Sequence, residues 1–416
     1  MAGEGRGGGV VVEIDGLAPG GDAVGRQRDP EGQESPSHGR VTFVPLAAPG
    51  ERVRVRIERQ KGRVAWGELL QVERPSAVRV SPPCPVFGTC GGCQWQHVEL
   101  GAQREAKRAI VARALGVEVA AVRAAGPPFG YRDRAKWAVG KGGALGFRAR
   151  RAHDVVDQMV DGRFICLLPA PELARAYPAL RALARGLAPG VEIEAQAGAE
   201  GVHVNIARAD ATSASHARRE TDRLPEAGVV GLSIGGRNLW GREAVDVGEP
   251  GSAPLAVPAG GFAQVGRAAN AALVGAVLDA MGDAPGVVVE LYAGSGNFTR
   301  HLAARWPGQV HATDGDPAAV ARGRANVPGA SWTPRPPGVP ADTVVLDPPR
   351  EGADRAHLEV AARASRRIVY VSCDPQTLGR DARHLASAGF RVTHATALDL
   401  MPQTFHVEVV TTFDRS

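Results

Sequence analysis

Two patterns of apolar and polar positions divide the chain into a β-rich first part and an alternating last part. Over residues 10–75, short stretches with period-two alternation, such as ERVRVRIERQKGRVAWGELLQVE, are separated by polar turns, which predicts a small all-β barrel. From about residue 268, apolar strand-like runs alternate with helix-like segments, beginning with AANAALVGAVLDAM. Strands that alternate with helices predict a layered and mostly parallel α/β sheet.

The region between these two parts mixes both patterns. Residues 131–250 contain several strand-like runs and a helix-like segment near 171–187, which predicts a mixed α+β domain. Residues 1–9 are too glycine-rich to pack and predict a tail, and the polar residues 26–40 predict an exposed loop. We therefore expect a tail over 1–9, a barrel over 10–76, a central domain over 77–255 and an α/β domain over 256–416.

The composition, with 44% hydrophobic and 22% charged residues, is that of a globular protein. No apolar run approaches the roughly 18 residues of a membrane helix, and no secretory signal is visible. We therefore expect a cytoplasmic protein that does not associate with a membrane. The net charge of +5 hides an asymmetry, because residues 40–151 hold 21 basic and 8 acidic residues. This clustering favours a polyanionic partner. A general preference for Arg over Lys would explain the residue type but not the clustering.

One strand of the predicted barrel carries a basic face. In RVRVRIER, Arg appears at positions 52, 54, 56 and 59. Small barrels often bind oligonucleotides, which would make this face a nucleic-acid contact. An Arg-rich strand face that simply faces solvent is the alternative, and this segment alone does not decide between them.

A glycine turn follows the first apolar strand of the α/β part. The run VVVELYAGSGNFTRHLA reads as a strand, then Gly294-Ser295-Gly296, then a helix, and such glycines let the backbone approach a ligand closely. The run lacks the third glycine of the dinucleotide fingerprint and the Gly-Lys-Ser/Thr of a phosphate loop. Asp314 ends the next strand, where a carboxylate suits a ribose diol. A nucleoside cofactor without a pyrophosphate fits, and S-adenosylmethionine is such a molecule.

Three further residues place reactive groups on the predicted strands. Asp347 follows the apolar strand DTVVLDPP, and Cys373 follows RIVYVSC and precedes a predicted helix. Strand ends of this kind meet at the ligand-binding edge of an open α/β sheet. A thiol near a helix N-terminus can have a lowered pKa and act as a nucleophile, although a single Cys is more often an inert apolar residue. Glu408 interrupts the apolar run HVEVV and is a base only if its strand lines the same cleft.

The other four cysteines form a second candidate group. Cys84, Cys90 and Cys93 lie together in CPVFGTCGGCQWQH, and Cys166 is distant. Disulfides are not expected in a reducing compartment. Four thiolates suit either tetrahedral zinc or an iron–sulfur cluster, and free buried thiols are the remaining alternative.

Together these motifs resemble the RNA 5-methyluridine methyltransferases, a family of class I S-adenosylmethionine enzymes. ELYAGSGNFT is similar to the cofactor loop of that family, LDPPREG to its acidic cleft loop, YVSCDPQTLGRD to its nucleophile loop and PQTFHVE to its base motif. GGFAQV resembles its Phe-x-Gln motif, and residues 10–75 are similar to its TRAM domain, an oligonucleotide-binding barrel. CPVFGTCGGCQWQH matches the iron–sulfur subset. The resemblance covers nearly the whole chain.

This resemblance implies a Rossmann-like methyltransferase domain, a mixed central domain and an OB-like barrel. It implies methyl transfer from S-adenosylmethionine to C5 of a uridine in ribosomal or transfer RNA, with Cys373 as the nucleophile that bonds to C6 and Glu408 as the base. It implies cofactor and cleft positions at Gln264, Tyr292, Gly294, Gly296, Asn297, Asp314 and Asp347. It also implies a 4Fe–4S cluster on Cys84, Cys90, Cys93 and Cys166.

The sequence departs from the family pattern at three places. The Pro-rich segment SWTPRPPGVPAD offers no residue to contact adenine. Gly266 stands where the family often has Asn, and Cys166 lies in FICLLP, where the family more often has Cys-Pro. None of these departures touches the nucleophile.

Two other functions compete with this reading. An amino-methyltransferase of bases would carry Asp/Asn-Pro-Pro-aromatic and no nucleophilic Cys, whereas this chain has Arg350 after the prolines and has Cys373. A non-catalytic RNA-binding or iron–sulfur module would not need the glycine turn, Cys373 and Glu408. We expect an RNA partner and a monomer, although the sequence does not specify the oligomeric state.

Overall fold

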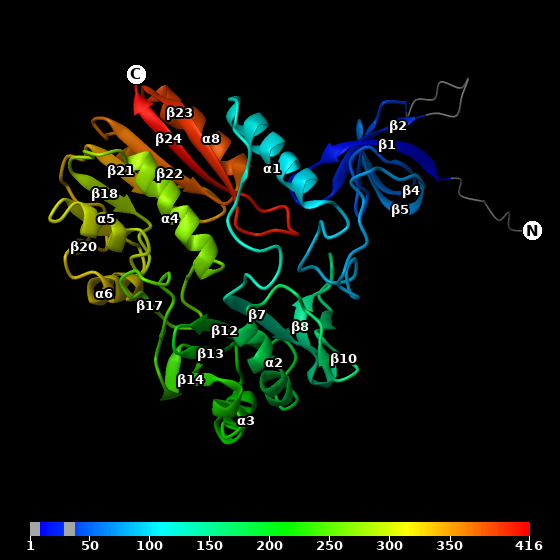
Figure 1. Ribbon diagram of the computed structural model, residues 1–416, viewed down its shortest axis with the longest axis horizontal. Coiled ribbons are helices and arrows are strands. Elements are labelled where there is room, and N and C mark those ends of the chain that lie inside the picture. The colour runs from blue at the N-terminus through cyan, green and yellow to red at the C-terminus, as the bar shows by residue number, and fades with distance from the viewer. Residues whose placement is uncertain (1–8, 29–37) are drawn as a thin grey trace, which may run out of the picture. The chain divides into compact units, whose positions relative to one another are not determined.

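A computed structural model describes residues 9–28 and 38–416, so most of the predicted tail and loop lie outside the described residues. The chain forms two compact units. Unit 1 comprises Met1–Ile110 with Pro402–Phe405, and unit 2 comprises Val111–Met401 with His406–Ser416 (Figure 1). The domain boundaries at residues 76 and 255 stay predictions. No helix within the described ranges is long and apolar enough to cross a bilayer.

Unit 1 contains a closed five-stranded barrel, as the alternation predicts. The strands lie in the order β1-β2-β3-β5-β4. Alternate residues such as Val53 and Val55 on one strand point inward and are fully buried, whereas their neighbours face outward. The strands are β1 (Val10–Leu17), β2 (Ala23–Arg28), β3 (Val41–Val44), β4 (Arg52–Lys61) and β5 (Val64–Arg74).

The rest of unit 1 is an irregular, Cys-rich segment followed by the start of helix α1 (Leu100–Leu115). Trp95 of this segment is fully buried and donates a hydrogen bond from its indole nitrogen to the Gly21 carbonyl. The backbone nitrogens of Gln94 and Trp95 both donate to the carbonyl of Gln403, each at 3.0 Å. Gln103 donates to the Gln403 side chain and accepts from its backbone nitrogen. A short C-terminal segment is therefore built into this unit.

Unit 2 begins with the central mixed sheet that the sequence predicts. Seven strands lie in the order β15-β14-β13-β12-β7-β8-β9, and α2 (Pro171–Ala184) buries its apolar side on them. The strands are β7 (Arg134–Val139), β8 (Leu145–Arg148), β9 (Val155–Asp157), β12 (Glu192–Gly198), β13 (Gly201–Ala207), β14 (Val229–Ile234) and β15 (Arg237–Gly241).

Shorter elements complete this part. They are α3 (Ala211–Arg219), the 3-10 turns Lys141–Gly143 and Pro225–Ala227, and the pairs β10 (Met159–Val160) with β11 (Arg163–Phe164) and β16 (Val245–Asp246) with β17 (Ala256–Val257).

The second sheet of unit 2 has eight strands in the order β20-β19-β18-β21-β22-β24-β23-β6. Strands β18 to β22 run parallel, and β24 is antiparallel to both of its neighbours. The strands are β6 (Arg123–Ala124), β18 (Val288–Leu291), β19 (Val310–Thr313), β20 (Ser331–Thr333), β21 (Thr343–Leu346), β22 (Arg367–Ser372), β23 (Phe390–Asp399) and β24 (Glu408–Arg415).

Helices cover both faces of this sheet, because its central strands are apolar on both sides (Figure 1). Ile368 and Tyr370 pack in one core with α7 and α8, whereas Val369 and Val371 pack in the other with α4 and α5. The helices are α4 (Arg267–Met281), α5 (Thr299–Arg305), α6 (Pro317–Asn326), α7 (Arg355–Ala361) and α8 (Pro375–Ser387). This is the predicted Rossmann-like architecture.

Candidate active site

Three neighbouring parallel strands end at one edge of the eight-stranded sheet. Leu291 of β18 pairs with Leu346 of β21, and Leu346 pairs with Tyr370 of β22. The residues that follow these strands, Tyr292, Asp347 and Cys373, therefore come to the same edge. The carboxyl ends of parallel strands form the ligand-binding edge of such sheets.

The antiparallel pairing of β22 with β24 brings the predicted base to the predicted nucleophile. Ser372 pairs with Val409, and the register has no shift between these strands. Continuing this register by one residue places Cys373 opposite Glu408. Glu408 is the first residue of β24 and is only 4% exposed, so its carboxyl group is held in protein rather than in solvent.

The turn after β22 fixes the position of Cys373. Asp374 is the N-cap of α8, and its carboxylate accepts hydrogen bonds from the backbone nitrogens of Gln376 and Thr377. The Ser372 hydroxyl donates to the Asp374 carbonyl at 3.0 Å. Both flanking residues are thus tied to the turn, and the thiol lies at the N-terminus of a helix of 13 residues.

The sequence-based expectation of a lowered pKa for the Cys373 thiol is wrong. Burial and the negative charges of Glu408 and Asp347 raise the pKa of the Cys373 thiol to about 12. The guanidinium of Arg350 opposes this shift. The carboxylates and burial therefore outweigh any effect of the helix N-terminus.

The two carboxyl groups are perturbed in the same direction. Burial raises the pKa of Asp347 to about 7. Burial and the charge of Asp347 raise the pKa of Glu408 well above its ordinary value, against the effect of Arg350. Two neighbouring buried carboxyl groups cannot both ionise easily, so protons are retained in this site near neutral pH. Arg350, to which the sequence analysis gave no role, is the cation of this group. Its position directly after two prolines at the end of the strand could have indicated that it lies at this site.

The glycine turn after β18 forms one wall of a pocket. Gly294 and Gly296 have φ angles of +56° and +100°, a region that favours glycine. The backbone nitrogen of Gly294 donates to Asp314 at 2.9 Å, and the other oxygen of that carboxylate accepts from the nitrogen of Asp316. Asp314 is therefore held beside the turn with lone pairs still available for a hydroxyl.

Several predicted cofactor positions line this pocket together. Gln264 donates to the Asp347 carboxylate at 3.3 Å. Tyr292 also lines the pocket, and its hydroxyl donates to the Asp354 side chain and accepts from the Asp354 backbone nitrogen at the start of α7. The predicted residues among those that line the pocket are Gln264, Tyr292, Gly294, Asn297 and Asp347.

Gly266, one of the departures from the family pattern, has a steric reason. A Cβ atom at this position would lie 2.0 Å from the carbonyl oxygen of Tyr131. The chain approaches that carbonyl closely just before α4 begins at Arg267. A side chain at residue 266 would push Gln264 and the helix start away from the pocket.

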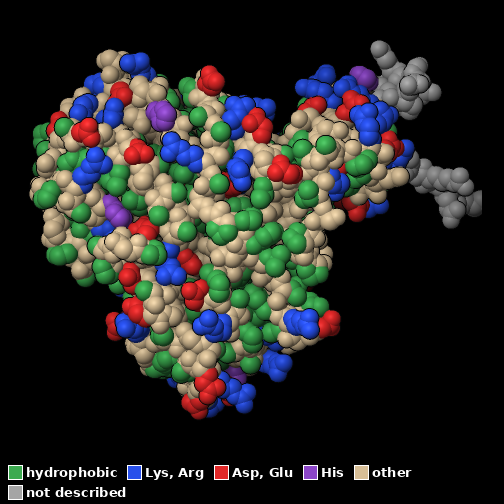
Figure 2. All heavy atoms as spheres, in the orientation of Figure 1, with side chains coloured by type: hydrophobic (Ala, Val, Ile, Leu, Met, Phe, Trp, Pro, Cys, Tyr) green, Lys and Arg blue, Asp and Glu red, His purple; other side chains and the backbone are tan. Residues whose placement is uncertain are grey.

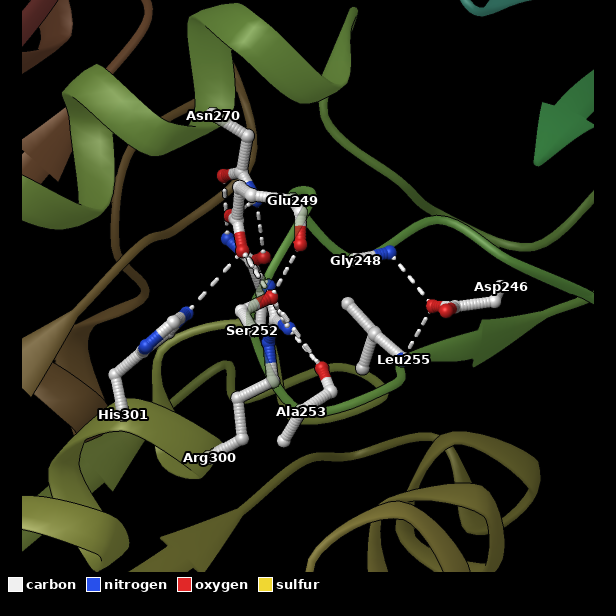
Figure 3. Close-up of polar contacts among 10 residues, drawn as sticks. Asp246, Gly248, Glu249, Ser252, Ala253, Leu255, Asn270, Arg300 and His301 are labelled. Atoms are coloured by element: carbon white, nitrogen blue, oxygen red, sulfur yellow. Dashed lines mark hydrogen bonds and ion pairs between the residues drawn. The ribbon is translucent and has the colours of Figure 1, made fainter. Parts of the chain in front are cut away.

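A polar network centred on Glu249 (Figure 3) connects to the glycine turn through Asn297, which follows Gly296 in the chain. Asn297 and Asn270 exchange two side-chain hydrogen bonds, at 2.8 and 2.9 Å. Asn270 and Arg300 both donate to Glu249, on which the dashed lines in Figure 3 converge. Ser252 also donates to Glu249, at 3.0 Å. The sequence analysis missed Glu249 and Asn270, although a lone Asn in the apolar helix AANAALVGAVLDAM was a usable signal.

The cysteine loop of unit 1 is made of tight turns. The nitrogen of Cys90 donates to the Val86 carbonyl, and the nitrogen of Phe87 donates to the Cys84 carbonyl. The nitrogen of Gly92 donates to the sulfur of Cys90 at 3.4 Å. Over residues 9–28 and 38–416, however, no group of three or more His, Cys, Asp or Glu side chains is arranged to hold a metal ion. The four thiol groups are nevertheless the donor type that an iron–sulfur cluster or zinc takes.

Two family models match parts of the chain. The family model described as tRNA (Uracil-5-)-methyltransferase matches residues 339–415, and that of the TRAM domain matches residues 6–70. A 23S rRNA (uracil(1939)-C(5))-methyltransferase RlmD from Alkalilimnicola ehrlichii is 34% identical, covering 90% of this chain and 92% of its own.

A protein of the same description from Klebsiella pneumoniae is 31% identical over 98% of this chain and 96% of its own. The crystal structure of the Pyrococcus abyssi tRNA (uracil-54, C5)-methyltransferase in complex with S-adenosyl-L-homocysteine superimposes with a TM-score of 0.74. It is 25% identical and covers 98% of this chain and 100% of its own.

Proposed function

The chain belongs to the RNA uracil-C5 methyltransferase family, and we propose that it methylates C5 of one uridine in 23S ribosomal RNA, using Cys373 and Glu408. The observation that carries the proposal is the strand register that sets Cys373 opposite Glu408 beside a glycine-lined pocket. The relatives described as RlmD, which match along nearly the whole chain, support ribosomal rather than transfer RNA.

The residue types match what the reaction needs. C5 of uracil is too weak a nucleophile to take a methyl group unaided. When the Cys373 thiolate bonds to C6, electron density moves to C5, which can then form the new carbon–carbon bond. S-adenosylmethionine, when bound, supplies the methyl group as an electrophile. Glu408 then takes the C5 proton, and the bond between sulfur and C6 breaks to return the thiolate.

The raised pKa values are consistent with these roles. A carboxylate whose pKa burial raises is a stronger base than an exposed one, which suits proton removal by Glu408. Cys373 must lose its proton before it can add, and Arg350 favours its thiolate form. The free energy of that ionisation is therefore part of the barrier to addition at C6.

S-adenosylmethionine fits the residues around the glycine turn. The left-handed backbone at Gly294 and Gly296 lets a ligand approach the main chain. Asp314 is oriented by two backbone nitrogens and would bind the ribose hydroxyls. Gln264 and Asp347 line the same pocket and would offer polar groups to the bound cofactor.

We also propose that Cys84, Cys90, Cys93 and Cys166 hold a 4Fe–4S cluster. The tight turns of the loop that carries Cys84, Cys90 and Cys93 support it, as does the backbone nitrogen that donates to the Cys90 sulfur. The methyl transfer needs no electrons, so no catalytic step passes through the cluster. Iron and sulfide analysis of anaerobically purified protein tests the proposal, with Cys90→Ser as the variant. Absence of both elements from the wild-type protein would overturn it.

The catalytic proposal is tested with RNA that carries tritium at C5 of uridine. Wild-type protein should release tritium, and Cys373→Ala should release none. Glu408→Gln should instead accumulate a covalent protein–RNA adduct that survives denaturing electrophoresis, because addition no longer leads to elimination. Glu359→Gln, a change on the exposed side of α7, serves as the control. Normal release by Cys373→Ala would exclude the mechanism, and methylation of transfer RNA but not 23S RNA would exclude the substrate.

A further inference from the structure

The basic face of the barrel is divided into a neutralised part and an unneutralised part. Arg54 and Arg56 form ion pairs with Glu73 and Glu68, respectively. The Arg52 Nε atom lies 3.3 Å from a carboxylate oxygen of Glu73. Three of the four arginines that give the sequence its basic stripe therefore already have acidic partners, which reduces what they can offer to a phosphate.

The tip of the β4–β5 hairpin is different. Arg59, Lys61 and Arg63 are exposed and form no ion pair with any described residue of the chain. Glu58 is the one acidic residue in segment 58–64. Figure 2 shows Lys and Arg side chains gathered over the barrel. The hairpin tip therefore offers a polyanion three exposed positive charges that no described acidic residue neutralises.

An aromatic column lies directly beside these cations. The register pairs Arg59 with Trp66 and Trp66 with Phe43, on three adjacent strands. The Phe43 and Trp66 rings are stacked, with centroids 5.8 Å apart and planes at 15°. The Arg59 guanidinium lies 4.4 Å from the centre of the Trp66 ring. Both rings are partly exposed on the outer surface, because the neighbouring residues Thr42 and Ala65 point into the barrel.

We propose that this hairpin tip, defined as Phe43, Trp66, Arg59, Lys61 and Arg63, binds a single-stranded segment of the RNA substrate. Bases would extend the aromatic column at its Phe43 or Arg59 end, and the cations would contact the phosphates. Stacking tolerates any base, so the tip would provide affinity and positioning rather than sequence selection. The inference rests on the proposed function only in taking RNA as the substrate.

The test measures binding of a fluorescent single-stranded RNA oligonucleotide of mixed sequence to the full chain. Arg59→Ala and Trp66→Leu should each weaken binding by roughly tenfold, the loss typical of one stacked base. Arg59→Lys keeps the charge but not the planar group and should lose part of the affinity. Lys61→Ala and Arg63→Ala should each lower the slope of log affinity against log salt by about one. Arg56→Ala, an exposed but ion-paired residue on the same strand, should change little.

If Arg56→Ala and Arg59→Ala reduced RNA affinity equally, binding would depend only on overall positive charge, and the proposal would be overturned. Unchanged binding by Arg59→Ala, which removes only an exposed side chain, would also overturn it. The wild-type tritium assay separates this result from the function. If the wild-type protein methylates RNA and the tip variants bind RNA normally, only the RNA-binding role of the hairpin tip is refuted. If binding depends on the tip but the wild-type protein methylates no RNA, only the proposed methyltransferase function is refuted.

Discussion

The buried carboxylate of Glu249 should be a main support of the cofactor loop. Its side chain is 8% exposed, and that of its partner Arg300 is 2% exposed. The prediction is that Glu249→Gln, which keeps the shape and removes the charge, destabilises the protein. It should also weaken S-adenosylmethionine binding, because Asn270 loses a charged acceptor and Asn297 then loses a fixed partner.

The size of this loss follows from the pKa of Glu249 and from the cost of breaking a buried ion pair. Burial alone would raise the pKa of Glu249, but hydrogen bonds and the charge of Arg300 lower it from 4.5 to about 2. At about 1.4 kcal/mol per pKa unit, the ionised form stabilises the fold by about 3 kcal/mol. Leaving one partner of a buried ion pair uncompensated costs about 3–5 kcal/mol, which is the same range. We expect Glu249→Gln to lose about 3 kcal/mol at pH 7.

The stability that Glu249 contributes should decrease as the pH falls. Because the pKa is lower in the folded state, the stabilisation is complete above about pH 4.5 and declines as the pH falls towards 2. Urea unfolding of the full chain at pH 7 and at pH 4 measures the difference between variant and wild type. Glu243→Gln, an exposed change on the segment before β16, is the control. A variant as stable as this control at pH 7, or a deficit that does not shrink in acid, would refute the reasoning.

Three other changes test other parts of the site. Arg350→Ala removes the cation that lowers the pKa of Cys373, so the pH profile of kcat/KM should move to higher pH and activity at pH 7 should fall about tenfold. Arg350→Lys should restore part of the activity. A pH profile that does not move would contradict the role of Arg350. Gly266→Ala places a methyl group against the Tyr131 carbonyl and should lower the free energy of unfolding by about 1–3 kcal/mol, measured by thermal unfolding. It should also lower the affinity for the cofactor. Gly275→Ala, on α4 with open space around it, should lower neither. Asp374→Ala removes the N-cap of α8 and should cost about 1 kcal/mol and slow tritium release; release at the wild-type rate would show that the cap does not position Cys373.

The alternation of apolar residues predicted the barrel and both sheets, but some elements left a weak signal. Helix α6 was not predicted, although Asp316 and Pro317 are typical starting residues. Only Val320 and Gly323 of this helix are buried, and Gly323 packs closely against Trp332, so the helix lacks the usual apolar periodicity. The helix α3 was missed for a related reason, because only Ser213 and Ala217 of it are buried.

The candidate site was predictable as a set of residues but not as a geometry. The motifs indicate Cys373 and Glu408, whereas their apposition depends on β24 pairing with β22, which no local pattern specifies. The direction of the Cys373 pKa shift could not be read from sequence either. It depends on how close two carboxyl groups from other strands come to the thiol, and the sequence showed only the helix that follows.

The residues around Gln403 have a practical consequence for dissecting the molecule. Unit 1 is discontinuous in sequence, since its interior includes four residues that the ribosome adds about three hundred positions after Ile110. A fragment that stops at residue 110 would leave the amides of Gln94 and Trp95 and the side chain of Gln103 without their acceptors and donors. The barrel unit therefore cannot mature completely until translation is almost finished, and it should be studied as a fusion that supplies Pro402–Phe405 rather than as a simple N-terminal truncation.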